Sequence, residues 1–280
     1  MESFNKASVI AKKSIVYIML SIWAFTTIFP FIWLIVNSLK PSREILSSSF
    51  ALPAAPNLGN YINAFSKQNI LVAYANSLII SGITMIVVLL LASLVAYGLT
   101  RFEFKGKKIV ISLIIGSLMF PAFATVIPVF RMIVQMHLVN KHLGVIIPQV
   151  ASNLSFAVIV LMGFMRDLPI EVEESAFIDG ASVSKIFFSM ILPLSRPALA
   201  SVAIFVFLWS YNDLFTQMIV LRNRNMFPVC ALLNEISSRY GTDFGLMAAS
   251  VVLVVIPILI VYIFMQKNII RGLTAGAVKG

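Results

Sequence analysis

The sequence predicts an all-α integral membrane protein with six transmembrane helices. Of its 280 residues, 60% are hydrophobic and only 11% are charged, and the mean hydropathy is +0.97. Five runs of 22 residues contain no Asp, Glu, Lys or Arg, so each is long enough to cross the roughly 30 Å hydrocarbon core of a bilayer. A sixth run is interrupted only by Asp213. We therefore expect one membrane domain, residues 1–280, with spans at about 15–36, 71–99, 109–130, 144–165, 198–220 and 244–265.

We expect the first apolar run, 15–36, to be an uncleaved span rather than a signal peptide. It is longer than the roughly 7–15 apolar residues at the centre of a signal peptide, and no small-residue cleavage site accompanies Lys40 and Arg43, which follow it. Several runs contain proline, which membrane helices tolerate better than soluble helices do. The prolines inside these runs are Pro30, Pro121, Pro128, Pro148 and Pro257.

The fifth and sixth runs each carry a feature with structural meaning. In the fifth, the uncharged stretch Pro197–Asn212 has 16 residues, which is too short to cross a bilayer alone. Asp213 must therefore lie within the membrane or at its outer boundary. At the start of the sixth run, Gly241 and Gly245 are four residues apart and predict a close helix approach.

The distribution of basic residues predicts the orientation of the spans. Thirteen Lys and Arg residues fall in the N-terminus, the 101–108 connection, the 166–196 loop and the tail 267–280, against eight in the three opposite loops. Cytoplasmic segments carry the excess of Lys and Arg. Both termini and the 166–196 loop are therefore expected in the cytoplasm, and Arg101 belongs to the most basic short connection.

Catalytic, metal-binding and nucleic-acid-binding motifs are absent from the sequence. It contains no phosphate-binding loop, no His-Glu-x-x-His and no Gly-x-Ser-x-Gly. Cys230 is the single cysteine, and His137 and His142 are five positions apart, a spacing that does not share a helical face. No basic cluster is interleaved with aromatic residues, which argues against nucleic acid. We expect a non-enzymatic chain with no metal and no cofactor of its own.

The loop 166–196 gathers acidic residues, with four acids within nine positions. Asp167 followed by Pro169 predicts a cap and a first helical turn, and Glu171, Glu173 and Glu174 suit a helix N-terminus. Gly180 is suited to end that helix. A second amphipathic helix is then predicted from Val183, Ile186, Phe187 and Met190. The alternative, a helix lying on lipid, is disfavoured because acids would face an anionic inner leaflet.

Five short segments carry a resemblance to a known family. Glu174-Ser-Ala, Asp179-Gly-Ala and Ile191-Leu-Pro resemble the EAA loop of ABC importer permeases, with Ser175 where the motif has Ala. Tyr211-Asn-Asp and the ending Arg271-Gly-Leu-Thr-Ala-Gly resemble the carbohydrate branch, of the maltose-permease second-subunit type. In the pattern of that branch, Trp would stand at position 211 and Phe at position 214, where this sequence has Tyr211 and Leu214. The resemblance covers essentially the whole chain and implies the type I ABC importer permease fold.

The resemblance implies a bacterial plasma-membrane subunit that works with separate partners. These are a second homologous permease, two ATPase subunits that bind ATP and Mg²⁺, an extracytoplasmic sugar-binding protein, and membrane lipid. The 166–196 loop would contain the coupling helix that docks on the ATPase. The residues implied in this docking are Glu173, Glu174, Ser175, Ala176, Asp179, Gly180, Ala181, Leu192 and Pro193.

Polar side chains inside the predicted spans are candidates for a sugar path, because they normally face the bundle interior or a water-filled route. The candidates are Asn76, Gln149, Asn153, Trp209, Tyr211, Asn212, Asp213 and Gln217. For Asp213 the alternative is a packing role with Arg222 or Arg224. For Asn76, Gln149 and Asn153 the alternative is hydrogen bonding between helices.

The function that follows is a permease subunit of an ATP-driven, binding-protein-dependent importer of a di- or oligosaccharide. A secondary, ion-coupled transporter is the main alternative, but it would need more intramembrane charge than Asp213 alone. A membrane enzyme lacks its catalytic groups, and a channel lacks a charged ring or a filter-like segment.

Overall fold

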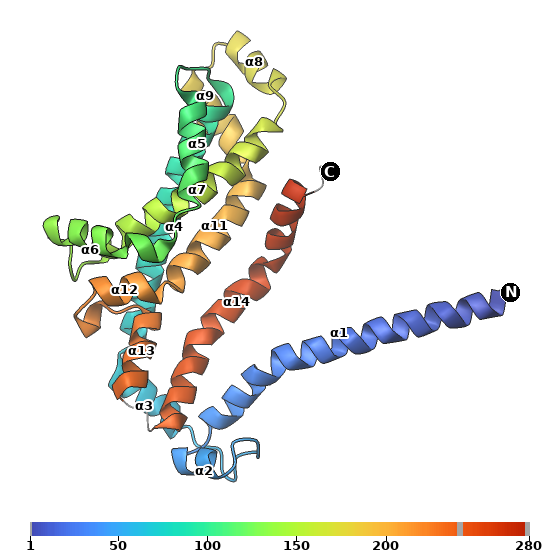
Figure 1. Cartoon of the computed structure of the whole chain (residues 1–280), viewed down its shortest axis with the longest axis vertical. Coiled ribbons are helices and arrows are strands. Elements are labelled where there is room, and N and C mark those ends of the chain that lie inside the picture. Colours follow the sequence, from blue (N-terminus) through green and yellow to red (C-terminus); the bar gives the residue numbers. More distant parts are fainter. Residues whose placement is uncertain (1, 240–242, 278–280) are drawn as a thin grey trace. The chain divides into compact units, whose positions relative to one another are not determined.

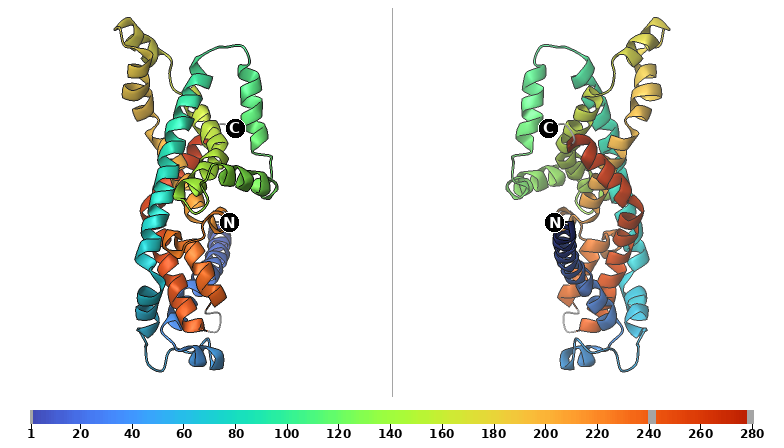
Figure 2. Two further views of the ribbon diagram at one scale, coloured as in Figure 1. Left: turned by 90° about the vertical axis from the view of Figure 1, so that its left-hand side faces the viewer. Right: turned by 90° about the vertical axis from the view of Figure 1, so that its right-hand side faces the viewer.

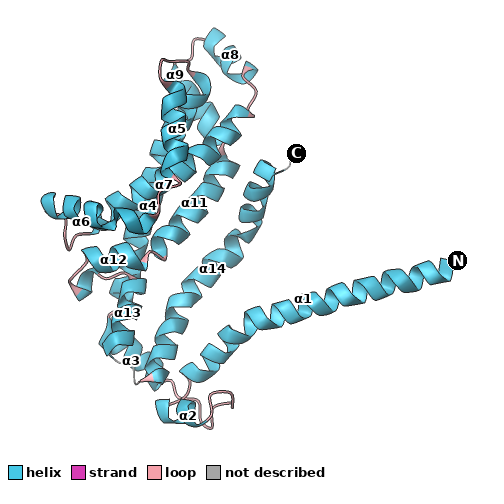
Figure 3. Ribbon diagram, in the orientation of Figure 1, coloured by secondary structure: helices cyan, strands magenta, loops and turns pink. Residues whose placement is uncertain are grey.

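The computed structural model describes residues 2–239 and 243–277, and every regular element in this part is helical (Figure 3). The chain forms two compact units, Met1–Asn69 with Leu233–Ile256, and Ile70–Leu232 with Pro257–Gly280. Two helices, α13 (Val229–Arg239) and α14 (Phe244–Ala277), run from one unit into the other. The single membrane domain expected from the sequence stays a prediction. The last three residues of the predicted tail lie outside the described part.

The first unit contains α1 (Glu2–Ser38), α2 (Ser42–Ser47) and α3 (Gly59–Gln68) (Figure 1). The segment after the first span is thus partly helical rather than a plain loop. Polar side chains of α3 form hydrogen bonds with the end of α1. Asn60 Nδ2 donates to the carbonyl oxygens of Ser38 and Lys40, each at 2.8 Å. The Ser38 hydroxyl also pairs with the Tyr61 hydroxyl at 2.6 Å.

Gly245, in the first turn of α14, makes a close backbone approach within the first unit. A Cβ added there would lie 2.6 Å from the Lys40 carbonyl oxygen and 2.7 Å from Asn60 Nδ2. Only glycine leaves room for this contact. The related prediction for Gly241 falls outside the described residues.

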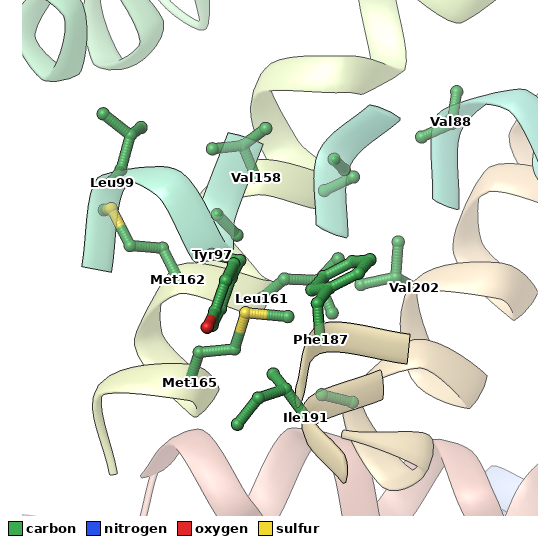
Figure 4. Close-up of a cluster of buried hydrophobic side chains, with 14 of the residues drawn as sticks. Val88, Tyr97, Leu99, Val158, Leu161, Met162, Met165, Phe187, Ile191 and Val202 are labelled. Carbon is green, nitrogen blue, oxygen red and sulfur yellow. The ribbon is translucent and has the colours of Figure 1, made fainter. Parts of the chain in front are cut away.

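The second unit is built around three helices that pack on one another: α4 (Ile70–Arg101), α7 (His142–Arg166) and α11 (Arg196–Tyr211). Small buried residues on α4, including Ala92 and Ala96, let the backbones come close. Larger side chains then fill the space between the helices, among them Leu161, Phe187 and Val202 (Figure 4). This core joins the membrane helices to the predicted cytoplasmic loop.

Three predicted spans form single helices that are long and apolar enough to cross a bilayer. These helices are Lys12–Ser38, Ile70–Arg101 and His142–Arg166. The sixth predicted span lies within the 34 residues of α14. The remaining two predicted spans are interrupted, so the structure does not contain six continuous spanning helices in its described residues.

The segment of the predicted span 109–130 is not one continuous helix. The chain forms α5 (Lys107–Ser117), then a short 3₁₀ helix (Ala122–Thr125) and α6 (Val126–Gln135), and it changes direction between α5 and α6 (Figure 2). The cause is Pro121, whose backbone is extended at ψ 126°. Proline lacks an N–H and disfavours helical conformation in the residue before it.

The predicted span 198–220 is also broken. α11 ends at Tyr211, and α12 (Leu214–Val220) begins after Asn212 and Asp213. At its other end α11 meets the helical stretch Val183–Leu194 at an angle of 75°. Asp213 therefore lies at a helix break rather than within a helix.

Candidate functional site

The acid-rich loop folds into a chain of short helices at the end of the second unit where α4 finishes and α5 begins (Figures 1 and 2). They are α8 (Glu171–Ile178), α9 (Val183–Ile186), a π-helical turn (Phe187–Ile191) and α10 (Leu192–Leu194). We call residues 166–196 the coupling loop. The cap predicted at Asp167 is wrong, because this residue ends α7 and α8 follows Ile170 without a side-chain cap.

Gly180 ends α8 as the sequence predicts. Its φ is +80°, in the left-handed region that glycine adopts most easily. The Ala181 N–H donates to the Ala176 carbonyl at 2.9 Å, and the Gly180 N–H donates to the Phe177 carbonyl at 3.0 Å. This pair of bonds is a Schellman motif. Ser182 then begins α9, because its hydroxyl accepts the Lys185 N–H at 3.3 Å.

Two of the residues assigned to ATPase docking lie on the inner face of α8. Glu173 and Ala176, three positions apart, are buried. The Glu173 carboxylate accepts from Arg101 Nε at 2.6 Å and from the Tyr97 hydroxyl at 3.1 Å. Arg101 and Tyr97 belong to the last turns of α4. Glu173 therefore fastens the coupling loop to α4 instead of facing outward.

The outer face of α8 is polar and acidic at one end and apolar at the other. Four of the docking candidates are exposed here: Glu174, Ser175, Asp179 and Gly180. Beside them the side chains of Phe177 and Ile178 are 49% and 87% exposed. Sequence reasoning missed these two residues, which lie three and four positions after Glu174 on the same helix.

The remaining docking candidates lie on either side of α9: Ala181 before it, and Leu192 and Pro193 after it, near the start of α11. In the π turn, the Leu192 N–H donates to the Phe187 carbonyl, five residues back. This wider turn precedes Pro193, which has no N–H to donate and is poorly accommodated in a regular helix. Leu192 and Pro193 are half-buried at the approach to the 75° bend, and Ala181 is half-buried next to Gly180.

A buried polar network occupies the break between α11 and α12, with Gln149 of α7 at its centre. Gln149 Nε2 donates to Asp213 Oδ2 at 2.8 Å, and Gln149 Oε1 accepts from the hydroxyls of Ser210 at 2.6 Å and Thr84 at 3.3 Å. The other carboxylate oxygen of Asp213 accepts the Thr216 N–H at 3.1 Å and so caps α12. The network ties α4, α7 and α11 to the helix break.

Other predicted path residues lie near this network. Gln217 is buried, and its Nε2 donates to the Ser210 carbonyl at 3.1 Å. Asn153 is also buried, and its Nδ2 donates to the Gln149 carbonyl at 2.7 Å. Within the described part of the chain, Gln217 Oε1 and the Tyr211 hydroxyl are buried without a hydrogen-bond partner.

The predicted path residues Trp209 and Asn212 do not join the network. Trp209 is 46% exposed and packs its ring at 4.8 Å from that of Phe156. Asn212 is exposed, and its amide donates to the Leu208 carbonyl at 2.8 Å.

Asn76 instead holds the segment after α12. Its Nδ2 donates to the carbonyl oxygens of Asn225 at 2.9 Å and Phe227 at 3.1 Å. The neighbouring Ser77 hydroxyl accepts the Val229 N–H at 2.9 Å. These bonds favour the structural alternative for Asn76 over a contact with sugar. Among the described residues, no group of three or more His, Cys, Asp or Glu could hold a metal ion.

The thiol of Cys230 is expected to react slowly in the native protein. Burial raises the pKa of the Cys230 thiol to about 11, and the nearby Asp213 carboxylate contributes to the rise. Because the thiolate is the reactive form, maleimide labelling at pH 8 should be roughly a hundredfold slower than at an ordinary thiol. The rate should rise with pH and become ordinary after unfolding, which mass spectrometry can follow. Fast labelling of the native protein at pH 8 would contradict the buried environment.

Comparisons with known proteins match most of the chain. The family model described as "Binding-protein-dependent transport system inner membrane component" matches residues 88–275. The diacetylchitobiose uptake system permease protein NgcG of Streptomyces coelicolor is 34% identical over 94% of this chain and 88% of its own length. The arabinooligosaccharides transport system permease protein AraQ of Halalkalibacterium halodurans is 34% identical over 92% of this chain and 93% of its own length.

A solved structure supports the fold. One chain of a bacterial ABC transporter involved in the import of the acidic polysaccharide alginate superposes with a TM-score of 0.80. The match covers 90% of this chain and 94% of that chain, at 22% sequence identity. At this level of identity the likeness concerns the fold alone.

Proposed function

Because the chain belongs to the family of binding-protein-dependent transport system inner membrane components, the permeases of ABC importers, we propose that it forms half of the path through which a di- or oligosaccharide enters the cell. The uptake is driven by ATP that separate subunits hydrolyse. The chain has no phosphate-binding loop, so the nucleotide and its Mg²⁺ belong to the partner. A second homologous permease completes the path, and an extracytoplasmic binding protein delivers the sugar.

The coupling loop is the observation that carries this proposal. α8 presents acids together with the exposed side chains of Phe177 and Ile178, and its inner face is bonded to α4 through Glu173. Large apolar side chains that remain exposed next to charged groups are typical of a surface that binds another protein. The ATPase is the partner proposed for this surface, which puts the coupling loop and both termini in the cytoplasm.

The sugar class rests on the relatives and on the polar groups at the α11–α12 break. NgcG and AraQ are named for diacetylchitobiose and for arabinooligosaccharides. Gln217 and Tyr211 each leave one buried polar atom without a partner, and Trp209 presents a half-exposed ring suited to stacking on a sugar. We assign these three residues to the path. In contrast, the Asp213 carboxylate is already bonded within the protein.

The test is uptake by vesicles that contain the permease pair, the ATPases and the binding protein. Labelled diacetylchitobiose and arabinooligosaccharides are the probes, with ATP supplied on the side of the ATPases. Accumulation should require ATP and the binding protein, and a protonophore should leave it unchanged. Accumulation without the ATPases, or its loss when the ion gradient is dissipated, would instead support the ion-coupled alternative.

A further inference from the structure

α8 carries one glutamate that cannot reach a docked ATPase. The Glu173 side chain is 4% exposed, whereas Glu171 and Glu174 on either side are exposed. A carboxylate removed from water is stable only when it is paired and hydrogen-bonded. The partners of Glu173 therefore show what the coupling helix is attached to.

Both partners of Glu173 come from the end of α4. Arg101 Nε lies 2.6 Å from Glu173 Oε1, and the Tyr97 hydroxyl donates to Glu173 Oε2 at 3.1 Å. Tyr97 and Arg101 are four residues apart and so share one helical face. The Tyr97 ring is itself fixed within the core of the second unit (Figure 4).

Arg101 makes a second contact that a lysine could not make at the same time. Its Nη2 donates to the Leu168 carbonyl at 3.2 Å, in the turn between α7 and α8. The planar guanidinium presents several donors in a fixed arrangement, whereas an ammonium is a single compact charge. One side chain of α4 thus holds both the turn before α8 and the inner face of α8.

The contact of Arg101 with Glu173 links α8 directly to α4, whereas the chain that follows α8 reaches α11 only through several turns. Downstream, the chain passes the Gly180 turn, the π turn and a 75° bend before α11. α4, in contrast, packs directly against α7 and α11. It also carries Thr84, about 25 Å from Arg101 along the helix, which contacts Gln149 in the polar network.

We propose that Arg101 and Glu173 are positioning residues whose ion pair fastens the coupling helix to α4. A displacement of α8 by the ATPase then moves α4 directly, and with it one wall of the sugar path. This inference rests on the proposed function, because it requires a partner that moves α8.

The energetics of buried ion pairs separate this role from simple stabilisation. Replacing a buried pair by apolar residues of similar volume is often neutral or stabilising for folding. The double variant Arg101→Met, Glu173→Leu should therefore fold and still bind the ATPases. It should lose the directional attachment that the two hydrogen-bonded charges provide.

The experiment measures sugar transported per ATP hydrolysed in vesicles that contain the complete importer. In the double variant this ratio should fall roughly tenfold, within the range typical of coupling between two sites. ATPase subunits that co-purify with the permease should stay at the wild-type level. The matched control is Glu103→Leu, Lys107→Met, which removes an ion pair of 2.7 Å whose glutamate is 88% exposed, at the same end of the unit. The control should keep the wild-type ratio.

Each other outcome has a defined meaning. A wild-type ratio in the double variant overturns the inference, and so does a loss of ATPase binding, which would make the pair part of docking. If the double variant does not accumulate, Glu173→Gln decides, because it keeps the shape and removes the charge; an unchanged ratio there also overturns the inference. Failure of the wild-type importer to use ATP would instead contradict the proposed function.

Discussion

Replacing Gly180 by valine is expected to lower sugar uptake strongly while the protein still inserts into the membrane. Gly180 has a φ of +80°, where a residue with a Cβ atom is disfavoured by roughly 1–2 kcal/mol and a β-branched residue by more. No atom lies within 4 Å of an added Cβ, so the effect comes from the backbone and not from a clash. The turn that orients α8 against α9 is then lost. Uptake should fall roughly tenfold or more, since each 1.4 kcal/mol changes a population tenfold.

Gly106 offers a matched control for this variant. It also has a positive φ, +94°, and it also has open space around an added Cβ, but it precedes α5. Gly106→Val therefore introduces the same kind of strain outside the coupling loop. Uptake, membrane content and co-purified ATPase would be measured for both variants. Equal losses of uptake in the two would contradict a special role for the Gly180 turn.

Replacing Asp213 by alanine is expected to have a comparable effect for a different reason. The substitution removes the cap of α12, at about 0.5–2 kcal/mol. It also removes the 2.8 Å bond from Gln149 Nε2 to a charged carboxylate, at about 1.5–3 kcal/mol, and leaves this buried amide with only its 3.4 Å contact to the Ser210 carbonyl. The helix break should lose its geometry, and uptake should fall roughly tenfold or more because each 1.4 kcal/mol is a factor of ten. Thermal stability of the purified permease should fall as well.

Asp213→Asn distinguishes a structural carboxylate from one that contacts sugar. Asparagine caps helices as well as aspartate does, and the Gln149 amide can reverse to pair with it. This variant should therefore keep most of the uptake. Asn223→Ala, which removes an exposed cap from a short 3₁₀ helix, controls for capping alone and should have little effect. A loss in Asp213→Asn as large as in Asp213→Ala would mean that the negative charge itself acts on the substrate.

The long helices could be predicted because their sequence signal is local. α4 and α7 are continuous apolar runs, and their length alone matches a bilayer. The sequence does not predict the break at Pro121, because membrane helices tolerate proline better than soluble helices do. Pro148 and Pro257 lie inside continuous helices. The presence of proline alone therefore does not tell a broken span from a continuous one. Whether a proline breaks a membrane helix depends on whether neighbouring groups hydrogen-bond the backbone carbonyl that it leaves without a donor. Those neighbours are distant in sequence.

In the candidate site too, features made by neighbouring residues could be predicted, and features made by residues distant in sequence could not. The Gly180 turn and the Ser182 cap were predictable, because their hydrogen bonds join residues at most five positions apart. The inward direction of Glu173 is not predictable from local sequence, because its partner Arg101 is 72 residues away. The role of Gln149 was likewise hidden, since its contacts to Thr84 and Asp213 span 65 and 64 residues.

The exposed side chain of Ile178 has a consequence for the stability of the subunit in the cell. A large apolar group that is 87% exposed favours self-association whenever the partner proposed to cover it is missing. Quality-control proteases recognise such surfaces, so an orphan copy should be short-lived. Balanced synthesis of this chain and its motor would then be a condition for its survival, independent of whether any sugar is present.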